Sequence, residues 1–155
     1  MHVAIKQLTA DDWPLWRSVR LQALADSPTA FGSNLTEWAN APAERWQARL
    51  NNDAFNIIAF DADQPVGQVS ATATPDPAIE LTSMWVASTA RGKGVGDTLI
   101  NAVTTWAQHQ QAPLITLSVK HTNHHARRLY ERHGFTTTGP GDDHDELRMT
   151  RPLHT

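Results

Sequence analysis

Residues 91–97, RGKGVGD, place three glycines within five positions and a cation on each side of the first glycine. A strand-like segment precedes this stretch and a helix-like segment follows it. Glycines let the backbone approach a ligand closely, and the first N–H groups of a helix are unpaired donors in a field that favours an anion. The stretch therefore predicts a turn that binds a phosphate group.

The spacing of the glycines excludes two common phosphate-binding loops. The dinucleotide fingerprint needs G-x-G-x-x-G, whereas these glycines follow G-x-G-x-G at positions 92, 94 and 96. The P-loop needs Lys-Ser or Lys-Thr after its last glycine, and neither pair follows here. The pattern that remains is R-x-x-G-x-G, formed by Arg91, Gly94 and Gly96. Taken alone, an ordinary tight turn before a helix would give the same pattern.

Two further side chains could move protons. Tyr130, the only tyrosine, lies in a predicted helix, and Asn123 lies seven residues before it, about two helical turns away and so on the same face. The phenol could act as an acid, or it could be a half-buried aromatic of an amphipathic helix. Glu80 lies inside an apolar strand, where a carboxylate is unusual unless it faces a cavity. It could act as a base, or it could lie on a solvated strand face.

The elements expected to position these residues are helices and strands, recognised by the helical and the alternating spacing of their apolar residues. Helices are predicted over 11–26, 43–53, 97–107 and 123–134. Strands are predicted over 3–8, 55–62, 64–74, 78–86, 113–119, 135–139 and 145–153. Residues 27–42 are punctuated by Pro28, Gly32 and Pro42, and predict a loop. The order β-α-α-β-β-β-α-β-α-β-β predicts an α/β (α+β) domain with a mixed sheet.

Length and composition narrow the class of protein. The 155 residues suit a single domain over 1–155, and 40% of them are apolar. The chain has no cysteine, which excludes disulfides and thiolate nucleophiles and fits a cytoplasmic protein. The net charge of −3 argues against a nucleic-acid partner, and the sequence shows neither a membrane-length apolar run nor a signal-peptide pattern. The histidines at 121, 124 and 125 lack a matching carboxylate motif, so we expect no metal.

Two stretches together resemble the GNAT (general N-acetyltransferase) superfamily. IELTSMWVASTARGKGVG is similar to the family's central strand and its acetyl-CoA pyrophosphate loop. LSVKHTNHHARRLYERHGF is similar to its second signature, with Asn123, Tyr130 and Gly134-Phe135 at matching distances. The resemblance covers residues 79–135. It implies a GNAT-like fold, in which a mixed, mostly antiparallel central sheet is flanked by helices.

The resemblance also implies an activity, the transfer of acetyl from acetyl-CoA, as co-substrate, to a primary amine. With no cysteine to carry the acetyl group, direct attack in a ternary complex is the simplest route. Tyr130 would protonate the coenzyme A sulfur, and Glu80 matches a position where some members carry a catalytic glutamate. Asn123 would bond the pantetheine arm, or it would only cap its helix. The other cofactor-binding positions implied are Met84, Trp85, Val86, Arg91, Gly92, Lys93, Gly94, Val95, Gly96 and Asp97.

Asp97 departs from the family, which often has a small or hydroxyl residue at this position. Its carboxylate would repel a pyrophosphate, so we expect the side chain to turn away from the turn and leave only its amide there.

The sequence says less about which amine accepts the acetyl group and where that amine binds. Phe31 and Trp38 could line an acceptor pocket, or they could pack beneath a loop. The acidic turn PGDDHDE could attract a cationic amine, or it could simply keep a hairpin soluble. The acceptor could be a small molecule or a peptide, and the protein a monomer or a homodimer. The competing hypothesis is a catalytically silent acyl-CoA-binding or sensing module on the same fold.

Overall fold

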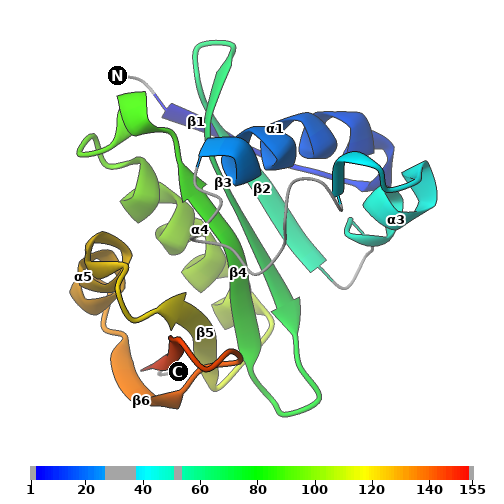
Figure 1. The fold of residues 1–155 in the computed structure, drawn as a ribbon. Helices are drawn as coiled ribbons and strands as arrows, with labels where there is room; N and C mark the ends of the chain where they lie inside the picture. The colour runs from blue at the N-terminus through cyan, green and yellow to red at the C-terminus, as the bar shows by residue number, and fades with distance from the viewer. Residues whose placement is uncertain (1–2, 27–37, 51–53, 154–155) are drawn as a thin grey trace.

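A computed structural model describes residues 3–26, 38–50 and 54–153. Its centre is a seven-stranded sheet in the order β1-β2-β3-β4-β5-β7-β6 (Figure 1). The strands are β1 Val3–Gln7, β2 Ala54–Asp61, β3 Gln64–Ala73, β4 Ile79–Val86, β5 Leu114–Lys120, β6 Thr136–Pro140 and β7 Glu146–Pro152. The helices are α1 Trp13–Asp26, α3 Ala43–Ala48, α4 Val95–His109 and α5 His124–Arg132, with 3-10 turns η1 Ala10–Asp12 and η3 Ser88–Ala90.

The sheet is mixed and mostly antiparallel, as the sequence predicts. Strands β4 and β5 run parallel, and the other neighbouring pairs among the described strands run antiparallel. The parallel pair follows from the connection through α4, because two parallel strands need a crossover between them. The predicted order of strands and helices is therefore confirmed.

Helices lie on both faces of the sheet. A Cβ placed on Gly67 of β3 would lie 3.0 Å from side chains of Val95 and Leu99, so this face of β3 packs against α4. Successive side chains of a strand point to opposite faces. Gln68 and its ladder partner Trp85 therefore face the other layer, where the Trp85 indole bonds Asp26 of α1. Figure 1 shows α1 and α3 together on one side and α4 and α5 on the other.

The helix boundaries differ from the predicted ones. Helix α4 runs from Val95 to His109 and is longer at both ends than the predicted 97–107. Residues 10–12 form η1, where the backbone N–H of Thr9 donates to the Asp12 carboxylate at 2.9 Å, so α1 begins at Trp13 rather than at residue 11. Helix α3 ends at Ala48, with Arg49 as its C-cap, rather than continuing toward Asp53. The early end places the Arg49 side chain over the sheet, where it donates to Ser83.

No helix within the described part of the chain is long and apolar enough to cross a membrane.

We predict that Gly67→Ala lowers the free energy of unfolding by about 1–3 kcal/mol, the usual cost of overpacking. The added methyl would meet Val95, Leu99 and the Trp85 carbonyl oxygen, each at 3.0 Å, and the carbonyl belongs to the backbone and cannot move aside cheaply. Urea unfolding measures the effect. Val95→Ala removes one of the three obstacles, so the double variant should lose less than the sum of the two single losses. Strict additivity would show that α4 does not lie this close to β3.

Candidate functional site

The glycine turn leaves bare backbone at the start of α4. Gly92 and Gly94 have φ of 77° and 85°, the left-handed region that favours glycine, and Gly94 is the N-cap of the helix. A Cβ at either glycine would meet nothing within 4 Å. The first N–H groups of α4 have no acceptor within the helix and carry the positive end of its dipole. The turn can therefore bind an anion through its backbone.

Strands β4 and β5 separate beside this turn. Their ladder holds only at Ile79↔Ile115 and Glu80↔Thr116. Beyond it, the register of β4 against β3 shifts so that Ser83 and Met84 together oppose Val69, and Ser83 takes a φ of 57°. Such a bulge bends a strand and ends its regular pairing.

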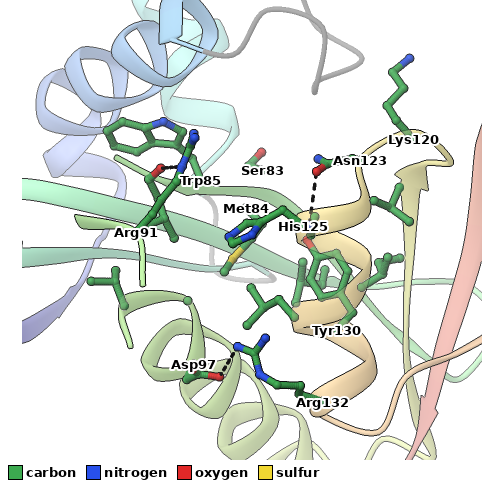
Figure 2. A pocket seen from close by; sticks show the side chains of 18 of the residues that line it. Ser83, Met84, Trp85, Arg91, Asp97, Lys120, Asn123, His125, Tyr130 and Arg132 are labelled. Carbon is green, nitrogen blue, oxygen red and sulfur yellow. Dashed lines mark hydrogen bonds and ion pairs between the residues drawn. The ribbon is translucent and has the colours of Figure 1, made fainter. Parts of the chain in front are cut away.

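A cleft of about 820 Å³ opens where the two strands part. It is lined by residues 81–86 of β4, by the glycine turn and first turn of α4, by 117–120 of β5, and by α5 (Figure 2). The cleft brings Met84, Trp85, Val86 and Asn123 beside the turn, as well as Tyr130. Of the turn residues named from the sequence, Lys93 is absent from the lining, so its side chain does not contribute to the walls.

Tyr130 lies on the cleft side of α5 and is only 5% exposed (Figure 2). Its ring packs against Phe135 with centroids 5.8 Å apart. Burial raises the pKa of the phenol far above its ordinary value, so the hydroxyl keeps its proton and remains a donor.

Asn123 caps α5, since its Oδ1 accepts from the Ala126 N–H at 3.3 Å. The capping interpretation is therefore confirmed. Because Asn123 also lines the cleft, a contact with a bound molecule is compatible with that role.

The carboxylate of Asp97 turns toward α5. It accepts from His133 Nε2 at 2.7 Å. It also accepts from Arg132 Nη2 at 3.3 Å, as Figure 2 shows. The hydrogen bond from His133, with the nearby Arg132 charge, lowers the pKa of Asp97 and keeps it ionised. The Arg132 charge offsets that of Asp97, and the side chain joins the first turn of α4 to the end of α5. These contacts agree with the expectation that the carboxylate turns away from the glycine turn, although Asp97 still lines the cleft.

Arg91 is held by the residues that precede the turn and by α1. Its Nε donates to the Val86 carbonyl at 3.3 Å, and its Nη2 lies 3.7 Å from Asp26 Oδ2. The same carboxylate oxygen accepts from Trp85 Nε1 at 3.0 Å. Asp26 thus joins α1, β4 and the glycine turn, although the sequence offered no sign of it.

Glu80 lies at the edge of the site, on the opposite face of β4 from the residues packed against α4, and does not line the cleft itself. Its ladder partners are Thr72 and Thr116, whose side chains share its face. Partial burial raises the pKa of Glu80, Asp142 raises it further, and Arg148 opposes both. The pKa of Glu80 therefore lies above that of a fully solvated carboxylate.

The acidic turn is partly neutralised. Asp142 pairs with Arg148, which also donates to Thr116 Oγ1 at 3.0 Å. Asp145 pairs with Lys120 at 2.9 Å. Two of the four carboxylates expected to attract a cationic amine therefore already have cations of β5 and β7 as partners.

The two aromatic residues expected at the acceptor pocket do not gather there. Trp38 is buried against Trp46, with ring centroids 4.8 Å apart, and the Arg45 guanidinium lies 4.0 Å from its ring centroid. It is absent from the lining of the cleft, so the packing interpretation fits it. Phe31 lies outside the described residues.

Sequence reasoning missed the cleft residues Asp26, Ser83 and His125. A lone acid at a helix end and a serine in a strand have no distinguishing local pattern. Within the ranges the structure describes, no three His, Asp or Glu side chains gather in a way that could hold a metal ion.

Comparisons with known proteins agree with this architecture. The family model described as "Acetyltransferase (GNAT) family" matches residues 6–135. The "Uncharacterized N-acetyltransferase YhfO" of Bacillus subtilis (strain 168) is 38% identical over 55 residues, which are 36% of this chain and 37% of that relative. The chain thus matches about a third of the length of this curated relative.

Two solved structures share the fold over nearly the whole chain. A GNAT-family acetyltransferase from Streptococcus pneumoniae gives a TM-score of 0.82 at 17% identity and covers 99% of this chain and 100% of its own. The PaiA N-acetyltransferase from Thermoplasma acidophilum, in complex with coenzyme A, gives 0.76 at 16% identity, with 99% and 100% covered. The family match spans every residue that lines the cleft, and the chain therefore belongs to the GNAT family of acetyltransferases.

Proposed function

We propose that the protein transfers an acetyl group from acetyl-CoA to a primary amine, directly and in a ternary complex. The observation that carries the proposal is the bare glycine turn at the start of α4, which opens into the cleft between β4 and β5 beside a buried tyrosine. The PaiA structure, which has the same fold, contains coenzyme A. The chain has no cysteine, so an acetyl-cysteine intermediate plays no part.

The residues present fit acetyl-CoA as the co-substrate that supplies the activated acetyl group. The amides of 91–97 would bind the pyrophosphate, because Gly92 and Gly94 leave that space open and the Asp97 carboxylate turns away from it. The Arg91 side chain would add a positive charge. Backbone groups of Met84, Trp85 and Val86 line the cleft where β4 leaves its ladder, and would bond the pantetheine arm together with Asn123.

Two side chains would move the protons. Tyr130 keeps its phenolic proton because of its burial, and would donate it to the departing sulfur. The amine must lose a proton before it can attack, since an alkylammonium of pKa about 10.4 has no lone pair. Glu80 would accept that proton, directly or through water, and its raised pKa brings it closer to neutral pH.

Acetyl-CoA should raise the melting temperature of the protein, because a ligand that binds only the folded state stabilises it. Gly94→Val should abolish that rise, since the new side chain would extend into the space intended for the phosphates. Gly134→Val is the matched control. Its φ of 87° imposes the same backbone strain of about 1–3 kcal/mol, at the end of α5 and outside the cleft. An equal response to acetyl-CoA in both variants would contradict the assignment of the turn.

Tyr130→Phe should lower kcat by roughly 10²–10⁴-fold, the usual contribution of a positioned acid, and leave the affinity for acetyl-CoA unchanged. The substitution keeps the ring that packs against Phe135 and removes only the hydroxyl. Release of thiol from acetyl-CoA in the presence of amines measures kcat, and calorimetry measures affinity. Unchanged turnover would make the phenol structural. Binding of acetyl-CoA without turnover of any amine would favour an acyl-CoA-binding module.

Glu80→Gln should lower the rate near neutral pH, with partial recovery at high pH where the free amine accumulates. In the wild type, kcat/KM should fall as pH drops through the raised pKa of Glu80, because protonation removes the base. Asp142→Asn should move this fall to lower pH and Arg148→Gln to higher pH, since Asp142 raises the pKa of Glu80 and Arg148 lowers it. If neither of these two substitutions shifts the pH profile of kcat/KM, Glu80 is not the base of the reaction.

A further inference from the structure

Arg49 extends from the end of α3 to the bulge of β4. Its Nη2 donates to Ser83 Oγ at 3.1 Å, and its guanidinium carbon lies 5.8 Å from the ring centroid of Trp38. Ser83 itself lines the cleft. The bulge, which gives Ser83 a φ of 57°, is what allows this hydroxyl to meet an arginine from the α1 and α3 layer. Arg49 does not line the cleft itself, but it contacts the cleft through Ser83, on the side of the sheet away from α4.

Arg49 differs in its partner from four other cations that lie near the cleft. Arg91, Lys120, Arg132 and Arg148 each lie within ion-pair distance of a carboxylate. Arg49 bonds a hydroxyl, and no ion pair joins it to an acid within the described ranges. A partly buried cation without an acid keeps a strong preference for an anion.

Two further arginines lie near Arg49. Burial and the Arg45 charge lower the pKa of Arg49, so Arg45 lies close enough to act on it. Arg20 is 6% exposed, and burial together with the Arg49 charge lowers the pKa of Arg20 to about 10. Arg45 and Arg20 thus lie close enough to Arg49 for their charges to act on one another.

The position of Arg49 relative to Glu80 limits the size of an acceptor molecule that could contact both side chains. Glu80 and Ser83 lie three residues apart on β4, which corresponds to roughly 10 Å of strand. Glu80 shares its sheet face with Thr72, on the side of the sheet opposite α4, and Arg49 reaches β4 from that same side. Because both side chains lie on the same side of β4, a single short molecule with an amine at one end and an anion at the other could contact both.

We propose that the acceptor is an amino acid or a similarly short amino-carboxylate, and that Arg49 and Ser83 bind its carboxylate. The inference rests on the proposed acetyl transfer and specifies the acceptor of that reaction. The flat guanidinium fork matches the two oxygens of a carboxylate, and the Ser83 hydroxyl can donate to one of them. The amine of the same molecule would then lie toward Glu80 and the opening between β4 and β5.

The test compares amino acids with their carboxamides, with the amines that remain after loss of the carboxylate, and with the aminophosphonate analogues. Thiol release gives kcat/KM for each. The carboxylates should exceed the carboxamides by about 10- to 100-fold, mainly through KM, as expected for a hydrogen bond to a charged group. Equal rates for acids and carboxamides, faster transfer to polyamines, or a preference of tenfold or more for phosphonates would each overturn the proposal.

Substitutions test whether the preference for carboxylates over carboxamides depends on Arg49. Arg49→Gln should bring the ratio of carboxylate to carboxamide near one, and Arg49→Lys should keep part of it, because an ammonium retains the charge without the fork. The ratio does not depend on the fraction of enzyme that folds. Ser83→Ala, which leaves the arginine in place, should reduce it less. Arg128→Gln removes an equal charge from an exposed position of α5 and should keep the wild-type ratio. An unchanged ratio in Arg49→Gln would overturn the proposal.

A binding measurement separates this inference from the proposed function. In the presence of coenzyme A, amino acids should raise the melting temperature of the wild type and not of Arg49→Gln, whether or not turnover occurs. If no amine is acetylated but the shift is found, the proposed transfer fails and the carboxylate site stands. If amines are acetylated without any dependence on their carboxylate, the transfer stands and the carboxylate site fails.

Discussion

The divergence of β4 from β5 is the constraint on which the rest of the site depends. A parallel ladder that continued past Glu80 and Thr116 would close the sheet and leave no cleft. The bulge at Ser83 and Met84 prevents this, because two residues of β4 oppose one of β3 and the strand bends away. Backbone groups that a regular sheet would pair therefore face the cleft. The opening is part of the fold and needs no separate movement to form.

The second constraint is the close approach of α4, which carries the glycine turn to the edge of that opening. Gly67 lets α4 lie against β3, since any side chain there would meet Val95 and Leu99. On the other side, Asp97 bonds Arg132 and His133 and joins α4 to α5. Tyr130 lies on α5, which these bonds hold against α4. The glycine turn and the tyrosine are thus positioned by the same helix pair.

Local patterns in the sequence were enough to predict the order of elements, the glycine turn and the tyrosine, because each depends on residues close together in the chain. The contacts of Asp26 with Trp85, 59 residues away, and of Arg49 with Ser83, 34 residues away, could not be predicted. They depend on how α1 and α3 cross the sheet. The same limitation led us to consider Trp38 for the acceptor pocket. Its aromatic character was visible, but its packing on Trp46 was not.

The distribution of charge changes the expected acceptor. In the sequence, the acidic turn is the most conspicuous charged feature and suggests attraction of a cationic amine. In the structure, Asp142 and Asp145 are each bound to a cation, which removes much of that attraction. Arg49 has no comparable prominence in the sequence, yet in the described part of the chain it bonds a hydroxyl and forms no ion pair with an acid. A charged side chain attracts a ligand most strongly when no opposite charge of the protein lies beside it. Arg49 meets this condition better than the acidic turn does, which favours an acceptor that carries an anion.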